Sequence, residues 1–167
     1  VEDMMRKAAE ATCDFYIDEA TAAAGVPYWD TGAPLLHRLG DWQAADADPF
    51  NGFEPVYGVP AAIGAQGLLR LGRHLDNERY WQAGLTAAKT IFSEPYLSTD
   101  PTHEGLLLHS QYHRPNGWDH IPNGGTVPHG ESCMWGDYHL IELALYVHRL
   151  AAGESYLTFW SNGGGHA

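Results

Sequence analysis

The side chains that could do chemistry gather in polar, glycine- and proline-rich stretches of this 167-residue sequence. Seven carboxylates lie in these stretches: Asp30, Asp41, Asp46, Asp48, Asp119, Glu131 and Asp137. Glycosidic chemistry needs one carboxyl group that donates a proton and usually a second group that handles water. The chain also has six tryptophans, whose flat rings suit the faces of sugars. Together these residue types indicate a carbohydrate site, although each carboxylate could instead cap a helix or anchor a turn.

The ten histidines raise the alternative of a metal site. His109 and His113 are four residues apart, which on a helix places two imidazoles on one face, as in a zinc-binding HExxH motif. The segment does not read as helical, and the glutamate of that motif is missing. Asp46 and Asp48 likewise lack the later ligands of a calcium loop. Phosphate-binding glycine motifs are also absent, so we expect neither a metal ion nor an organic cofactor.

Composition excludes several classes of protein. With 21 acidic and 9 basic residues the formal net charge is −12, which argues against binding to nucleic acid or to an anionic membrane surface. No apolar stretch approaches the roughly 20 residues needed to span a bilayer. The acidic start, Val1-Glu2-Asp3, shows no signal-peptide pattern, so the cytoplasm is the expected location. Cys13 and Cys133 are far apart and are expected to be free thiols.

Four predicted helices must position these side chains. Apolar periodicity and stop signals place them at 2–24, 61–75, 78–92 and from about 135 to 152. The helix at 2–24 is expected to pack one apolar face on the core. Asp76-Asn77-Glu78 is a turn and N-cap signal that predicts an antiparallel hairpin of the second and third helices. Two long loops, 26–59 and 109–133, carry most of the reactive residues, and 105–109 is a candidate short buried strand.

Five short motifs also occur in a specific order. They are Gly25-Val26-Pro27-Tyr28-Trp29-Asp30, Ala61-Ala62-Ile63 with Gly67-Leu68-Leu69, Leu106-Leu107-Leu108-His109, His113-Arg114-Pro115, and Trp135-Gly136-Asp137-Tyr138 with Glu142. In this order the motifs resemble the C-terminal part of the unsaturated glucuronyl hydrolases, glycoside hydrolase family 88. A similar ending occurs in the related unsaturated rhamnogalacturonyl hydrolases of family 105. The resemblance covers nearly the whole chain, which corresponds to the last third to half of such an enzyme.

The resemblance implies an all-α fold in which residues 1–160 form the C-terminal part of an (α/α)6 toroid. The glycine-rich end of the sequence predicts a flexible tail at 161–167. It implies a hydrolase that removes the terminal unsaturated uronic acid from lyase-generated oligosaccharides by hydrating the C4=C5 double bond, without a cofactor. The family's two functional aspartates precede the matched motifs, so the resemblance places no catalytic residue in this chain. Tyr57-Gly58-Val59-Pro60 also departs from the D-S-S that the family has before its A-A-I helix.

The resemblance further implies a set of substrate-binding residues: Trp29, Asp30, His109, His113, Arg114, Ser132 and Trp135. Trp29 would stack on a sugar and Asp30 would accept a hydroxyl or anchor its loop. The two histidines and Arg114 would contact a uronate or sulfate, and Ser132 and Trp135 would lie near the closure of the pocket. Trp29 and Trp135 could equally be core residues.

The expected partner is an unsaturated uronide-terminated oligosaccharide. Because the surface is acidic, this expectation requires the few cations, Arg38 and Arg114 among them, to gather at the cleft. Two alternatives remain open. The chain could be a catalytically silent carbohydrate-binding relative, or a helical module whose toroid is completed by a second chain or another copy of itself.

Overall fold

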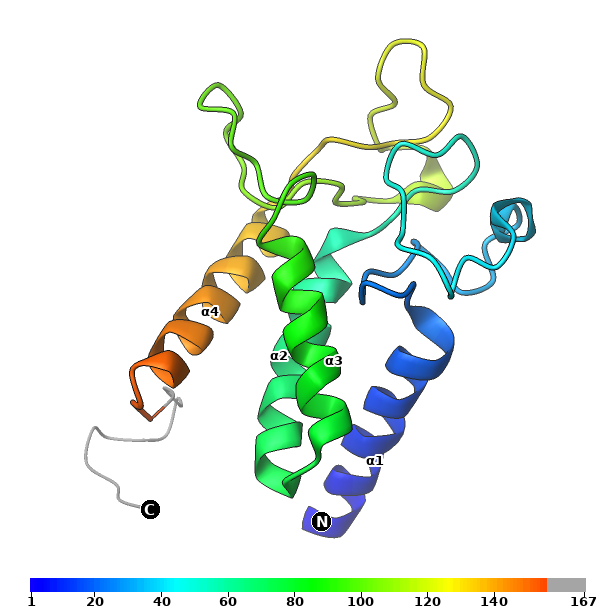
Figure 1. The fold of residues 1–167 in the computed structure, drawn as a ribbon. Coiled ribbons are helices and arrows are strands. Elements are labelled where there is room, and N and C mark those ends of the chain that lie inside the picture. The colour runs from blue at the N-terminus through cyan, green and yellow to red at the C-terminus, as the bar shows by residue number, and fades with distance from the viewer. Residues whose placement is uncertain (156–167) are drawn as a thin grey trace.

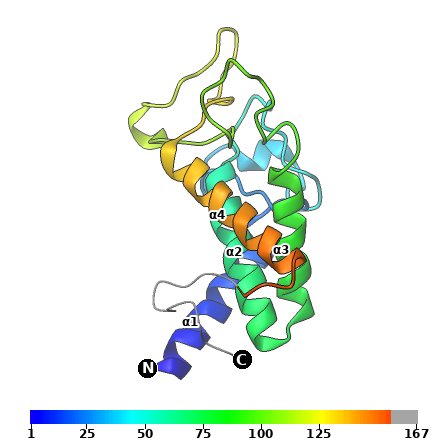
Figure 2. The same ribbon diagram turned by 90° about the vertical axis from the view of Figure 1, so that its left-hand side faces the viewer.

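A computed structural model describes residues 1–155, and this part of the chain is all-helical (Figures 1 and 2). Its α-helices are α1 (Glu2–Phe15), α2 (Gly58–Leu75), α3 (Glu78–Ile91) and α4 (Met134–Ala151). Shorter turns are a π-helical turn at Tyr16–Ala20 and 3₁₀ turns at Leu36–Leu39 and Arg114–Asn116. The tail expected at 161–167 lies outside the described residues.

The bounds of α2, α3 and α4 confirm the predicted helices to within three residues. The predicted turn between α2 and α3 is also confirmed, because Asp76 takes the left-handed conformation and the Asn77 side chain accepts a hydrogen bond from the Tyr80 N–H at 3.3 Å. After α4 the chain turns at Gly153, whose φ of +71° is a conformation that glycine adopts without strain.

The prediction for the first helix was wrong at its end and on its buried face. Helical structure stops at Ala20 because Thr21 is extended and its hydroxyl donates to the Tyr16 carbonyl. No residue of α1 is buried, and the expected apolar face leaves Met4 and Met5 exposed. The π-helical turn that follows α1 packs on α2 through the Tyr16 ring, which lies against Gly64 and donates a hydrogen bond to the Gly25 carbonyl at 3.0 Å.

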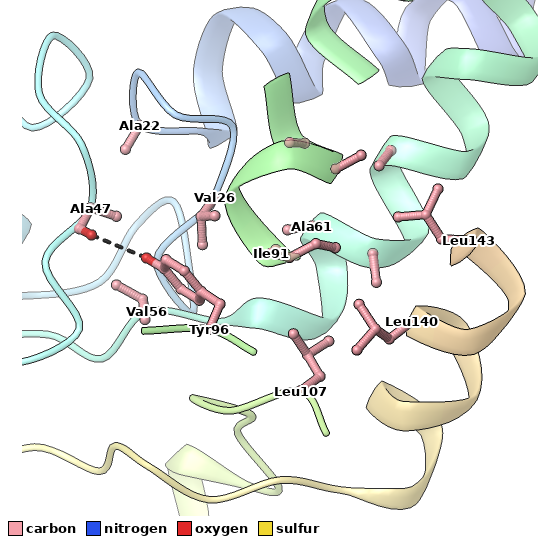
Figure 3. Close-up of a cluster of buried hydrophobic side chains, with 14 of the residues drawn as sticks. Ala22, Val26, Ala47, Val56, Ala61, Ile91, Tyr96, Leu107, Leu140 and Leu143 are labelled. Atoms are coloured by element: carbon pink, nitrogen blue, oxygen red, sulfur yellow. Dashed lines mark hydrogen bonds between the residues drawn. The ribbon is translucent and has the colours of Figure 1, made fainter. Parts of the chain in front are cut away.

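α2 is the central helix, and it packs against α1, α3 and α4. Its small residues let the partners approach closely. A Cβ at Gly72 would lie 2.7 Å from the Trp81 backbone nitrogen, and one at Gly84 of α3 would lie 2.8 Å from Leu69. Figure 3 shows the core that results, in which Ala61 of α2, Ile91 of α3 and Leu143 of α4 are fully buried.

The long loops gather at one end of the helices (Figure 1). They are tied to each other by side-chain to backbone hydrogen bonds: the Tyr96 hydroxyl donates to the Ala47 carbonyl at 3.0 Å (Figure 3), and the Thr126 hydroxyl donates to the Gly52 carbonyl at 2.9 Å. The strand considered at 105–109 does not form. Leu107 instead makes an isolated bridge with Leu97. The helices thus form a base on which one continuous layer of loops is held.

Candidate functional site

Five rings from distant parts of the sequence meet at the loop end of the molecule. The Tyr112 ring stacks on Trp118 with centroids 5.8 Å apart and lies 5.5 Å from Trp135. The His113 ring lies 5.0 Å from Trp118, and the hydroxyl of Tyr57 has a hydrogen bond to the Trp135 side chain. Tyr57, Tyr112, His113, Trp118 and Trp135 are called the aromatic cluster below.

Helix ends and one turn position this cluster. Tyr57 is the N-cap residue of α2, and Trp135 is in the first turn of α4. The other rings belong to the loop around the 3₁₀ turn Arg114–Asn116. Asp119 fixes this loop because its carboxylate accepts from the backbone N–H groups of Tyr112 and His113. The cluster is therefore held by backbone geometry rather than by its own side chains.

A polar cavity of about 240 Å³ lies against the cluster. The residues that line it are Ser110, Tyr112, Trp118, Asp119, His120, Glu131, Ser132 and Cys133. Tyr112 is 60 % exposed and Trp118 is 61 % exposed, so ring surface is open to a ligand. The lining thus combines aromatic faces with carboxylates and hydroxyls, which is the chemistry that binds sugar rings and their hydroxyl groups.

A second, mainly apolar cavity of about 410 Å³ lies between α1 and α2. Its lining includes Tyr16 and Ile63, and it shares Tyr57 and Trp135 with the aromatic cluster. Burial raises the pKa of Tyr57, while the hydrogen bond from Trp135 opposes that rise. Tyr57 and Trp135 thus belong both to the aromatic cluster and to the lining of this apolar cavity.

Three of the predicted substrate-binding residues come together here. His113 and Trp135 belong to the aromatic cluster, and Ser132 lines the polar cavity. Ser132 also packs so tightly on Gly105 that a Cβ there would clash with its hydroxyl. Arg114 follows His113 and begins the 3₁₀ turn, but it does not line the cavity.

Trp29 and Asp30 lie elsewhere, in the loop that precedes α2. The Trp29 indole donates to the carboxylate of Glu54 at 2.7 Å, and Glu54 also accepts from the Leu35 N–H at 2.7 Å. Asp30 accepts from the Gly32 N–H at 2.7 Å, which closes a turn. This geometry matches a loop anchor, one of the roles considered for Asp30, and neither residue lines the polar cavity.

His109 is 1 % exposed, and both of its ring nitrogens are engaged inside the protein. Nε2 lies 3.0 Å from the Pro95 carbonyl oxygen, and Nδ1 accepts from the Gly130 N–H at 3.1 Å. Burial lowers the pKa of His109 to about 4, so at neutral pH the ring is uncharged, with its proton on Nε2. His109 therefore links loop segments through its ring nitrogens, and its ring is too buried to contact a uronate.

The cations do not gather as the substrate expectation required. No Arg or Lys is among the residues that line the polar cavity. Arg38 lies over the Phe53 ring, 5.3 Å from its centroid. Arg79 is paired with Asp14 and Asp18 at the helices.

Most of the candidate carboxylates accept hydrogen bonds from backbone N–H groups. Asp137 accepts from the N–H groups of Leu106 and Leu107, at 3.0 and 2.8 Å. Asp48 accepts from the Phe50 N–H at 2.8 Å. Glu131 differs, because it lines the polar cavity and its carboxylate makes no hydrogen bond or ion pair with any residue between 1 and 155.

Tyr57, Tyr112, Trp118 and His120 were not among the predicted site residues. Tyr112 is adjacent to His113 in the sequence, and Trp118 follows it five residues later. A tight turn between them, marked by Pro115 and Gly117, is the signal that could have paired these two rings. Tyr57 could not be found this way, because only the fold brings the start of α2 to this loop.

Within the described part of the chain, no three His, Cys, Asp or Glu side chains are arranged to hold a metal ion. No helix between residues 1 and 155 is both long and apolar enough to cross a membrane. Comparison of the sequence and structure with protein-family models, curated proteins and solved structures found no match.

Proposed function

We propose that the aromatic cluster and the polar cavity bind carbohydrate, and that the chain is the C-terminal part of an (α/α)6 glycoside hydrolase of the unsaturated-uronide type. The observation that carries the proposal is the exposed Tyr112–Trp118 pair beside a cavity lined by carboxylates and hydroxyls. The order of the five sequence motifs supports the choice of enzyme class.

In the proposed reaction an aspartate protonates C4 of the unsaturated uronic acid and activates the water that adds at C5. The hemiketal formed at C5 then opens, and the glycosidic bond breaks. The aspartates that do this belong to the part of the family sequence that precedes the motifs found here. The role proposed for this chain is to hold the oligosaccharide: Tyr112 and Trp118 stack on a sugar ring, and Arg114 and His113 contact the uronate.

The enzyme is tested by the loss of ultraviolet absorbance of the C4=C5 bond when the intact gene product meets an unsaturated chondroitin or hyaluronan disaccharide. The expected result is a steady loss of absorbance. If the absorbance stays constant while the disaccharide binds, the silent carbohydrate-binding alternative replaces the hydrolase.

The stacking role is tested by Trp118→Ala, which should weaken binding of the disaccharide by about tenfold, as loss of a central aromatic contact commonly does. Tyr138→Ala is the matched control, because it removes an equally exposed ring from α4 outside the polar cavity. Equal affinities of the two variants would contradict the assignment of the site.

A second candidate function, a helical module completed by a partner, is favoured by α4. Met134, Tyr138, Ile141 and Leu145 are between 45 % and 84 % exposed. At 3.6 residues per turn they form one stripe on the side opposite the buried Leu143. An apolar stripe of this kind is typical of a helix that packs on two sides.

A further inference from the structure

The polar cavity carries negative charge that the proposed function does not explain. Its lining holds two carboxylates, Asp119 and Glu131, and no Arg or Lys. The Asp119 carboxylate already accepts from two backbone N–H groups, so it has a structural role. The backbone carbonyl of Glu131 accepts from the Ser110 N–H, but its carboxylate makes no hydrogen bond or ion pair with residues 1–155, so its charge is available to a ligand.

We propose that the polar cavity binds the protonated amino group of a hexosamine whose nitrogen is unsubstituted. This inference deepens the proposed function, on which it rests, by assigning a sugar to the cavity. The hexosamine is the unit joined to the uronic acid, and the uronate itself lies outside this cavity.

The aromatic faces support a cation at this place. A positive charge over the face of Trp or Tyr is attracted by the ring quadrupole, and Trp118 and Tyr112 both have exposed ring surface at the cavity. An ammonium between these faces and Glu131 would gain a cation–π contact together with an ion pair.

The same geometry discriminates among substituents on the nitrogen. An N-acetyl group carries no charge and would gain neither interaction. An N-sulfate would bring a negative charge next to Glu131 and Asp119 without a lining Arg or Lys to neutralise it. The expected order of affinity is therefore free amine, then acetylated amine, then sulfated amine.

The experiment uses calorimetric titration with a β-linked glucosamine dimer that carries free amines and with its N-acetylated counterpart. At about pH 6 an amine with the ordinary α-amino pKa is protonated. The free-amine dimer should bind roughly tenfold more tightly, since an exposed cation–π contact and an exposed ion pair each contribute a modest part. In Glu131→Gln this ratio should fall to near one. In the control Glu104→Gln, an exposed glutamate outside the cavity, the ratio should stay unchanged.

Two results would overturn the inference: dimers that bind equally or not at all, or a preference that survives Glu131→Gln in a folded variant. The absorbance assay tests the proposed hydrolase separately from the amine site. Selective binding of the free amine without hydrolysis of the uronide retains the amine site and rejects the hydrolase. Hydrolysis without amine selectivity rejects the amine site alone.

Discussion

His109 holds three loop segments together only while its ring is neutral, because Nδ1 must accept from the Gly130 N–H. Its pKa is about 4 in the folded chain, below the ordinary 6.5, so the unfolded chain binds this proton more readily. The stabilising contribution is therefore complete above pH 6.5 and is lost as the pH falls toward 4. We expect the free energy of unfolding to fall by on the order of 3 kcal/mol across this window.

Urea unfolding at several pH values between 7 and 4 measures this effect. His109→Asn should flatten the pH dependence, whereas His74→Asn, at an exposed position on α2, should keep the wild-type slope. An identical slope in wild type and His109→Asn would show that other groups cause the acid sensitivity.

Glu54 is a buried carboxylate whose two oxygens accept from the Trp29 indole and from the Leu35 N–H. Glu54→Ala leaves both donors without their charged acceptor, and we expect a loss of about 3 kcal/mol in unfolding free energy. Thermal and urea denaturation measure the loss, with Glu104→Ala as an exposed control. A loss below about 1 kcal/mol would mean that water replaces the carboxylate at little cost.

At the scale of single residues, sequence reasoning named His113, Ser132 and Trp135, which the structure brings to one place. It could not separate them from His109, because a histidine in a polar loop motif reads the same whether it faces solvent or the interior. Burial of His109 depends on Pro95 and Gly130, which lie 14 and 21 residues away.

Two glycines on α2 show how differently a helix can use the same residue. A Cβ at Gly64 would lie 2.7 Å from the Tyr16 ring, whereas one at Gly67 would meet no atom within 4 Å. Gly64→Ala should destabilise the protein by about 1–3 kcal/mol, because Tyr16 is held by its hydrogen bond to Gly25. Gly67→Ala should stabilise it by up to about 1 kcal/mol through helix propensity.

Thermal denaturation of this pair separates packing from propensity, since both changes are Gly→Ala on one helix. Stabilisation by both substitutions would mean that the Tyr16 ring does not pack tightly against Gly64 of α2. A different feature explains why three helices were predicted closely and the first was not. Caps and turns mark the ends of α2, α3 and α4, whereas the end of α1 depends on Thr21 becoming extended.

For the molecule as a whole, the apolar stripe on α4 predicts association. The stripe consists of Met134, Tyr138, Ile141 and Leu145. If it packs on a partner helix, Ile141→Lys should shift the mass measured by light scattering toward the monomer without lowering thermal stability. Leu85→Lys on α3 is a control, because this apolar side chain is exposed away from α4's stripe. A monomer in both wild type and variant would exclude association between copies of this chain.

The all-α character of the molecule followed from helical periodicity and from the loops' lack of it. The layer of loops could not be predicted in the same way, because its contacts join residues that are distant in sequence, such as Tyr96 with Ala47 and Thr126 with Gly52. The charge pattern was also hidden. The net charge of −12 can be counted in the sequence, but only the folded structure shows that neither Arg nor Lys lines the cavity.

The aromatic cluster also gives the site an intrinsic fluorescence signal. Two of the six tryptophans, Trp118 and Trp135, belong to it, and Trp118 borders the polar cavity directly. A ligand that stacked there would change the solvent around an indole and hence its emission, whereas Trp81 on α3 would report on the helical base. Occupancy of the loop end can therefore be followed in unlabelled protein, and single Trp→Phe changes would assign the signal to one end of the molecule.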